Sequence, residues 1–118
     1  MYYIFILLSF LNVPNSQQKE KNNPIIYLER TICYGTCPEY KIEIFNNEEG
    51  YYYGKRFVKN IGRFRFSINK EDISLIIKEA TEINFFNMKN EYSEAISDLP
   101  TTYIKINNKK IKDYYGSP

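Results

Sequence analysis

Apolar and polar residues alternate with a period of two along three stretches of the chain. Residues 40–44, 63–68 and 102–106 place mainly apolar side chains at every second position, with mainly charged side chains between them. Such a stretch is typical of a strand that has one face against the core and the other in water. Antiparallel sheets tolerate a wet face, whereas parallel sheets bury both faces. The alternation therefore predicts an antiparallel sheet.

Residues 70–83 carry apolar side chains at helical spacing instead. Asn69 stands just before them as an N-cap, and an acidic first turn suits the positive end of the helix dipole. The apolar stripe is formed by Ile73, Ile76, Ile77, Ala80 and Ile83. Asn84 ends the helix in this interpretation, and Phe85, Phe86 and Met88 follow it as a plug over one end of the core.

Asn-rich and Gly-containing stretches separate the apolar runs. Residues 46–50 and 107–108 have the residue types that hairpin turns require. Strands precede the helix, and two more follow it. We therefore expect an α+β fold, with an antiparallel sheet of about five to six strands and one helix packed on one face.

The N-terminal end has the pattern of an export signal. An apolar run at residues 4–11 is much shorter than the roughly 20 residues of a membrane-spanning helix, and polar residues and Pro14 follow it. We expect a signal peptide at 1–16, a polar tether at 17–24 and a single domain at 25–118, with no transmembrane span in the mature chain. No Lys or Arg precedes the run, so two alternatives stay open: the true start lies further upstream, or the segment is a buried terminal strand.

Composition narrows the possible chemistry. The chain has twelve Tyr and eight Phe but no Trp and no His. Aromatic residues favour sheets, and the absence of His removes the commonest general base and the imidazole metal ligand. The net charge of +2 is too small to make a nucleic acid the default partner. We assign no catalytic residue, no metal site and no cofactor.

The two cysteines, Cys33 and Cys37, lie four positions apart. Gly35 and Pro38 supply the turn that can bring their sulfurs within bonding reach. In an oxidising compartment we expect a disulfide between them, at the end of the first strand. Two alternatives stay open: a reactive thiol pair, or two ligands of a metal site whose other ligands would be carboxylates or come from another chain.

Basic residues also cluster beside aromatic ones. The basic residues are Lys55, Arg56, Lys59, Arg63 and Arg65, and the aromatic ones are Tyr51, Tyr52, Tyr53 and Phe57. Such a mixture can bind single-stranded nucleic acid. The alternation at residues 63–66 instead favours arginines that point to water and phenylalanines that point to the core, so we expect no nucleic-acid partner.

Four segments resemble a bacterial family described as a domain of unknown function, which is found mainly in exported or lipoprotein-like proteins. They read Leu-Glu-Arg-Thr at 28–31, Cys-Tyr-Gly-Thr-Cys-Pro at 33–38, Asp-Leu-Pro-Thr at 98–101 and Asp-Tyr-Tyr-Gly-Ser-Pro at 113–118. The resemblance implies a domain identity but no activity. Relatives usually continue into a terminal helix, so it also implies a domain truncated at its C-terminus.

The function predicted from these features is that of a small exported binding or interaction module, located in the periplasm, the cell envelope or the medium. Its partner is an unknown protein or small ligand. The candidate binding surface consists of Arg30, Tyr34, Asp98, Thr101 and Asp113. We expect Arg30 to pair with an acidic residue, and Asp98 to form a turn. The alternative is a thiol-disulfide or metal-handling protein that uses Cys33 and Cys37.

Overall fold

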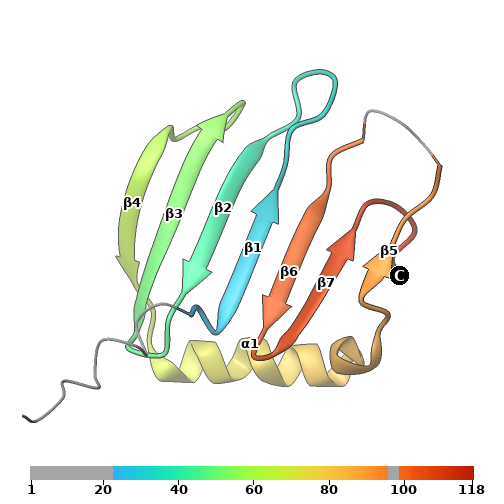
Figure 1. Cartoon of the computed structure of the whole chain (residues 1–118). Helices are drawn as coiled ribbons and strands as arrows, with labels where there is room; N and C mark the ends of the chain where they lie inside the picture. The colour runs from blue at the N-terminus through green and yellow to red at the C-terminus, as the bar shows by residue number, and fades with distance from the viewer. Residues whose placement is uncertain (1–22, 96–98) are drawn as a thin grey trace, which may run out of the picture.

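A computed structural model describes residues 23–95 and 99–118. Seven strands form one sheet in the order β4-β3-β2-β1-β6-β7-β5, and one helix runs below them (Figure 1). The elements are β1 (Ile26–Arg30), β2 (Glu39–Ile44), β3 (Glu49–Arg56), β4 (Gly62–Ser67), α1 (Lys70–Glu82), a 3₁₀ turn η4 (Phe85–Asn87), β5 (Glu91–Tyr92), β6 (Thr102–Ile106) and β7 (Lys109–Asp113).

The predicted α+β class is confirmed, and the sheet is slightly larger than expected. All neighbouring strands are antiparallel except β5, which pairs with β7 in parallel. β5 is only two residues long and has no alternation of its own, so the prediction of about five to six strands missed it. Both predicted hairpin turns are present, between β2 and β3 and between β6 and β7.

The helix begins and ends as its sequence predicts. The side-chain oxygen of Asn69 accepts a hydrogen bond from the backbone N–H of Asp72 at 2.8 Å. Asn84 adopts a left-handed conformation, with φ of 66°, and its N–H donates to the carbonyl oxygen of Thr81 at 3.1 Å. A residue in this conformation ends a helix because it turns the chain away from the helical path. Phe85 then enters the core, where it is buried.

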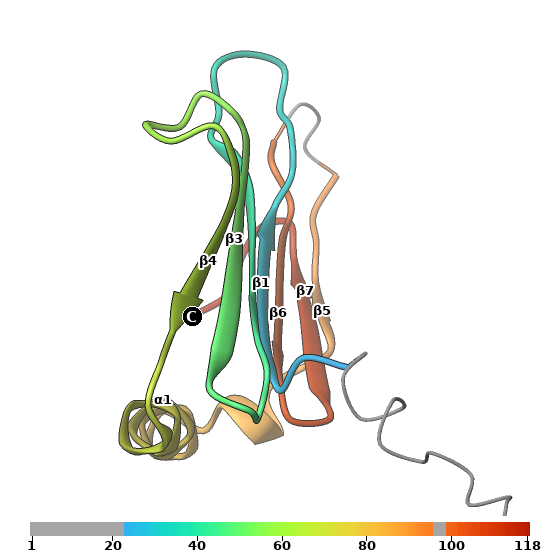
Figure 2. The same cartoon turned by 90° about the vertical axis from the view of Figure 1, so that its left-hand side faces the viewer.

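The helix covers only the lower end of one sheet face. In Figure 2 it lies to one side of the sheet, below the middle of the strands. Two buried clusters hold it there. The first contains Ile26, Ile44 and Ile73; the second contains Ala80, Phe85, Ile106 and Ile111. Because Ile77 packs against both, the helix joins the β1–β2 half of the sheet to the β6–β7 half.

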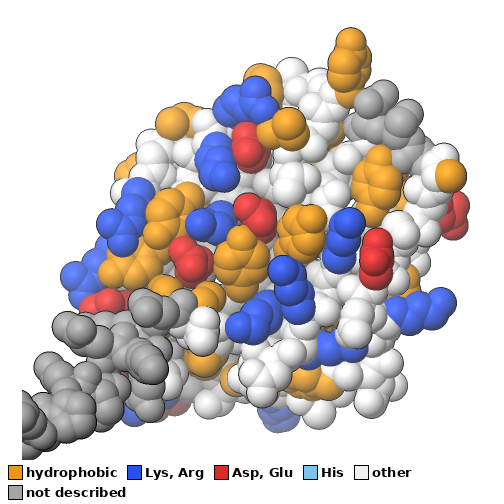
Figure 3. All heavy atoms as spheres, viewed as in Figure 1, with side chains coloured by type: hydrophobic (Ala, Val, Ile, Leu, Met, Phe, Trp, Pro, Cys, Tyr) orange, Lys and Arg blue, Asp and Glu red, His pale blue; other side chains and the backbone are white. Residues whose placement is uncertain are grey.

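The opposite face of the sheet is polar and aromatic. Figure 3 shows Lys and Arg, Asp and Glu, and apolar side chains mixed on this face. Several cations lie over tyrosine rings: Lys41 over Tyr53 at 4.5 Å and Lys110 over Tyr103 at 5.2 Å are two examples. Alternation along the strands therefore places charged residues here, as predicted.

No helix within residues 23–95 and 99–118 is long and apolar enough to cross a membrane. The expected signal peptide lies outside the described residues, as does nearly all of the expected tether.

Candidate functional site

Cys33 and Cys37 are joined in a short loop that follows β1. Their Cα atoms are 5.7 Å apart, and both side chains are half-buried. Tyr34 lies at the tip of this loop with 87% of its surface exposed. The predicted disulfide is therefore present, at the upper end of the sheet as drawn in Figure 1.

Two threonines fix the base of this loop to the segment that leads into β6. The backbone N–H of Thr31 donates to the carbonyl oxygen of Thr101 at 2.9 Å. The N–H of Thr101 donates in turn to Oγ1 of Thr31, also at 2.9 Å. The predicted surface residue Thr101 thus has a structural role. Its partner Thr31 was not singled out in the sequence, because a hydrogen bond between residues so far apart in the chain leaves no local pattern.

Arg30 and Asp113 lie in one row across the upper end of the helix-bearing face. Arg30 is paired with Tyr40 on β2 and with Thr102 on β6, and Thr102 is paired with Asp113 on β7. Paired residues of adjacent strands lie on the same face. The fold therefore places these two predicted surface residues on the same side of the sheet.

One atom of each of these residues is buried without a hydrogen bond. Nε of Arg30 and Oδ1 of Asp113 have no partner in the described part of the chain. The other carboxylate oxygen of Asp113, Oδ2, accepts a hydrogen bond from Oγ of Ser117 at 2.6 Å. The expected ion pair of Arg30 is not present among these residues. Buried polar atoms are normally satisfied by protein or water, so Nε of Arg30 and Oδ1 of Asp113 lack the partner that such atoms usually have.

In this row and in the next row toward the helix, the helix-bearing face carries apolar side chains that lie outside both buried clusters. We call this surface the open face; it is formed by Leu28, Tyr40, Tyr52 and Phe64. These side chains belong to neither buried cluster, and Phe64 is 47% exposed. The rings of Tyr40 and Tyr52 are 6.3 Å apart, and those of Tyr52 and Phe64 are 6.1 Å apart. They form a continuous aromatic row from β2 to β4.

The sequence prediction that Phe64 points to the core is only partly correct. Its side chain points to the helix-bearing face, as the alternation indicates, but it is not in the core. The helix lies too low to cover it. Sequence alternation predicts which face a side chain occupies; it does not predict how far along the strand the covering element extends.

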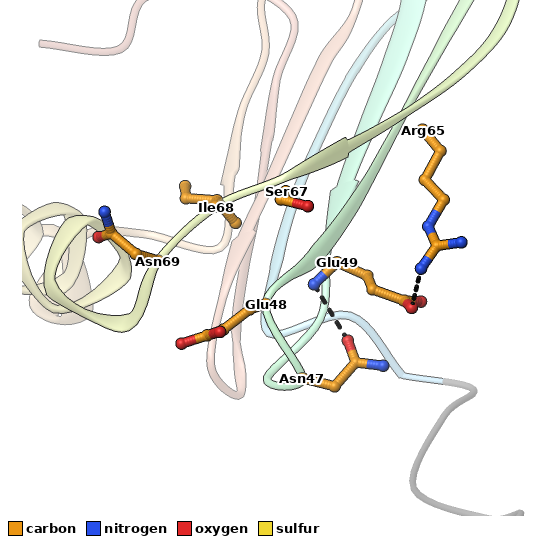
Figure 4. A pocket seen from close by; sticks show the side chains of 7 residues that line it. All are labelled: Asn47, Glu48, Glu49, Arg65, Ser67, Ile68 and Asn69. Carbon is orange, nitrogen blue, oxygen red and sulfur yellow. Dashed lines mark hydrogen bonds and ion pairs between the residues drawn. The ribbon is translucent and has the colours of Figure 1, made fainter.

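A shallow hollow lies at the other end of β4. It has a volume of about 440 Å³ and lies between the β2–β3 turn and the link from β4 to α1 (Figure 4). The side chain of Glu49 lines it and pairs with Arg65. The backbone N–H of Glu49 donates a hydrogen bond to Oδ1 of Asn47 at 3.2 Å. Within the described residues no group of three or more Cys, Asp or Glu side chains could hold a metal ion.

Among residues 23–95 and 99–118, Tyr27 on the polar face has a clearly raised side-chain pKa. Burial raises the pKa of its hydroxyl well above the usual value, and the hydrogen bond to Glu29, at 2.9 Å, raises that pKa further. Both effects favour the neutral phenol. Tyr27 is therefore a hydrogen-bond donor at physiological pH rather than a base.

The remaining predicted surface residue, Asp98, lies outside the described residues. The structure thus brings Arg30, Thr101 and Asp113 to the upper end of the sheet, beside the loop that carries Tyr34. Sequence reasoning missed the open face, although the alternation at residues 40–44 and 63–66 contained the signal for Tyr40 and Phe64.

These features define a small α+β domain with a disulfide-linked loop and a partly uncovered sheet. The chain belongs to the family described as Domain of unknown function (DUF6438), whose model matches residues 24–118. The predicted resemblance to a domain of unknown function is therefore confirmed. No curated protein matches the chain, and no solved structure matches it.

Proposed function

We propose that this chain is a binding module of an exported protein, and that it binds a protein partner with the open face and Arg30. The observation that carries the proposal is the position of the helix. It leaves the half-buried Leu28, Tyr40 and Tyr52 and the exposed Phe64 outside both buried clusters, beside Arg30. Aromatic residues and arginine are the side chains that contribute most to protein interfaces.

The chemistry of the surface indicates what the partner presents. An apolar segment would pack on the aromatic row. A carboxylate at its end would meet the guanidinium of Arg30, which can bind such a group through two parallel hydrogen bonds.

Export is supported by the apolar run at 4–11 and the polar residues after it. A disulfide is also typical of proteins outside the reducing cytosol. Within such a compartment, the Cys33–Cys37 bond would keep the loop beside Arg30 in one conformation.

Site-specific photo-crosslinking in the producing cells tests this proposal. A photoreactive phenylalanine analogue at Tyr52 should form an adduct of one defined mass. The same analogue at Tyr53, the next residue on the opposite face, should not form it. Arg30→Gln should remove most of the adduct, because an amide cannot replace the charged guanidinium. Equal adducts from both positions, or an adduct unaffected by Arg30→Gln, would contradict the proposal.

A thiol titration of the native protein distinguishes the proposed binding function from the alternative thiol-disulfide function. The thiol reagent should find no reactive thiol at Cys33 or Cys37, because the two are joined in a disulfide. Fast reduction and reoxidation of Cys33 and Cys37 by a thioredoxin-like partner would favour the alternative instead.

A further inference from the structure

β4 is an exposed edge of the sheet. It is the first strand in the sheet order, and five of its six residues are exposed. Figures 1 and 2 show it at the side of the sheet, where no other described strand lies beyond it. The opposite edge, β5, has only two residues. β4 is therefore the long edge at which another strand could pair.

Part of the backbone of β4 points away from the sheet. The N–H of Ile68 donates to the carbonyl oxygen of Glu48 at 3.0 Å, which fixes the direction of the hydrogen bonds between β4 and β3. In an antiparallel pair, residues alternate between those bonded to the neighbour and those facing outward. Phe64 and Phe66 thus pair with β3, while Arg63, Arg65 and Ser67 direct their N–H and C=O groups outward.

The side chains at this edge are sorted by face. Arg63 and Arg65 lie on the polar face, and Phe64 and Phe66 lie on the helix-bearing face. The guanidinium of Arg63 lies 4.4 Å from the centre of the Tyr51 ring and pairs with no acidic side chain of the described residues. Arg65 pairs with Glu49. The edge therefore presents an unpaired positive charge on one face and aromatic rings on the other.

Two hollows adjoin this edge. One, of about 290 Å³, is lined by Tyr51, Arg63 and Arg65. The other is the hollow of about 440 Å³ at the lower end of β4, to which Arg65 and Ser67 contribute (Figure 4). When a peptide pairs with a sheet edge, hydrogen bonds hold its backbone and pockets receive alternate side chains.

A second copy of this chain does not suit the edge. In an antiparallel pair related by a two-fold axis, residues on the same face lie opposite one another. Arg63 and Arg65 would then lie opposite arginines of the second copy. Like charges in directly opposed positions destabilise a strand pair, and charged residues on an edge are a common protection against such pairing.

We propose that β4 accepts an extended acidic segment of another protein as an eighth strand. The segment alternates Asp or Glu with apolar residues. Its carboxylates lie opposite Arg63 and Arg65, its apolar side chains continue the surface of Phe64 and Phe66, and its backbone bonds to the outward groups of Arg63, Arg65 and Ser67. This surface shares Phe64 with the open face but does not include Arg30, and it goes beyond the proposed function.

A short capped peptide that alternates Glu and Val is the probe. In a titration followed by NMR, the amide signals of Arg63, Arg65 and Ser67 should shift and saturate. Arg63→Glu should weaken binding by about tenfold, because an attraction becomes a repulsion across the strand pair. Lys110→Glu is the matched control, since Lys110 is also a cation over a tyrosine ring but lies on β7. It should leave the affinity within about twofold.

Methylated peptides test the strand pairing itself. In the antiparallel pairing proposed here, the glutamates lie directly opposite Arg63 and Arg65, so their N–H groups point to β4. N-methylation of the glutamates should abolish binding, and N-methylation of the valines should not, because their N–H groups point outward. Equal binding by a Lys and Val peptide, no effect of glutamate methylation, or shifts confined to Leu28, Tyr40 and Tyr52 would overturn the proposal. So would a stable dimer of the free protein that Arg63→Glu dissociates.

Arg30→Gln separates this inference from the proposed function. It should reduce photo-crosslinking through the open face and leave the affinity for the Glu and Val peptide unchanged. Failure of one test therefore does not imply failure of the other.

Discussion

At the scale of single residues, two glycines of β3 allow close contacts that a side chain would prevent. A Cβ atom added to Gly50 would lie 2.3 Å from the ring of Phe66, which stands over it from β4. A Cβ added to Gly54 would lie 1.9 Å from the backbone carbonyl oxygen of Asn60. A phenyl ring can rotate away, whereas a backbone carbonyl can move only with its loop. Gly54 is therefore the more constrained of the two.

Replacing Gly54 by Ala should lower the free energy of unfolding by about 1 to 3 kcal/mol, since the added methyl group overpacks a rigid contact. Denaturant unfolding measures the loss. Gly35→Ala is the control: the nearest atom to its Cβ is Sγ of Cys33 at 3.9 Å, so stability should change by less than about 0.5 kcal/mol. Equal losses in both variants would show that the Asn60 contact does not restrict Gly54.

The residues of the candidate site were only partly predictable. Arg30 and Asp113 were singled out because they stand in motif-like contexts, and the strand register then brought them to one row. Gly50 was assigned to a turn, although it lies in β3 beneath Phe66. Its role depends on a ring from the neighbouring strand, and the chain around Gly50 contains no sign of that ring.

At the scale of elements, α1 stabilises the sheet from one end. Its buried residues are Ile73 and Ala80, and Ile77 contacts both clusters. Leu75 points away from them and is 51% exposed. The helix therefore contributes through a narrow stripe rather than through a broad surface.

Ile77→Ala should reduce the free energy of unfolding by about 2 to 4 kcal/mol, because it removes the side chain shared by both clusters. Leu75→Ala, in the same helix, should cost less than about 0.5 kcal/mol. Thermal or denaturant unfolding of the two variants gives the comparison. A loss near zero for Ile77→Ala would mean that the helix does not hold the two halves of the sheet together.

The elements with strong periodicity were predicted well. The strands at 40–44, 63–68 and 102–106 and the helix at 70–83 correspond to β2, β4, β6 and α1 within about two residues. β5 was missed because two residues cannot show a period and because its parallel pairing with β7 depends on the whole sheet. The sequence pattern likewise could not predict where along the strands the helix would lie.

At the scale of the whole molecule, the disulfide and the core lie at opposite ends of the sheet. The buried clusters lie at the lower ends of β1, β2 and β6, whereas the Cys33–Cys37 loop follows the upper end of β1. The disulfide therefore restrains a local loop and does not contact the main hydrophobic clusters.

The double variant Cys33→Ser, Cys37→Ser should remain folded and lose about 2 kcal/mol of stability, as expected for closing a loop of about five residues. Wild-type protein unfolded in the presence of a reductant should show the same loss. Complete unfolding of the double variant would contradict the separation of the disulfide from the core.

The position of β1 also determines the order in which the sheet can assemble. β1 is the first strand in the chain, yet it lies in the middle of the sheet between β2 and β6. β2, β3 and β4 can pair beside β1 early, because strands that follow one another in the chain make local contacts. The other side of β1 must wait for β6, since Ile26 pairs with Ile106 and the whole intervening chain has to be closed into a loop. We therefore expect the β1–β6 pair to form last, and the nascent protein to expose β1 as an aggregation-prone sheet edge until β6 arrives.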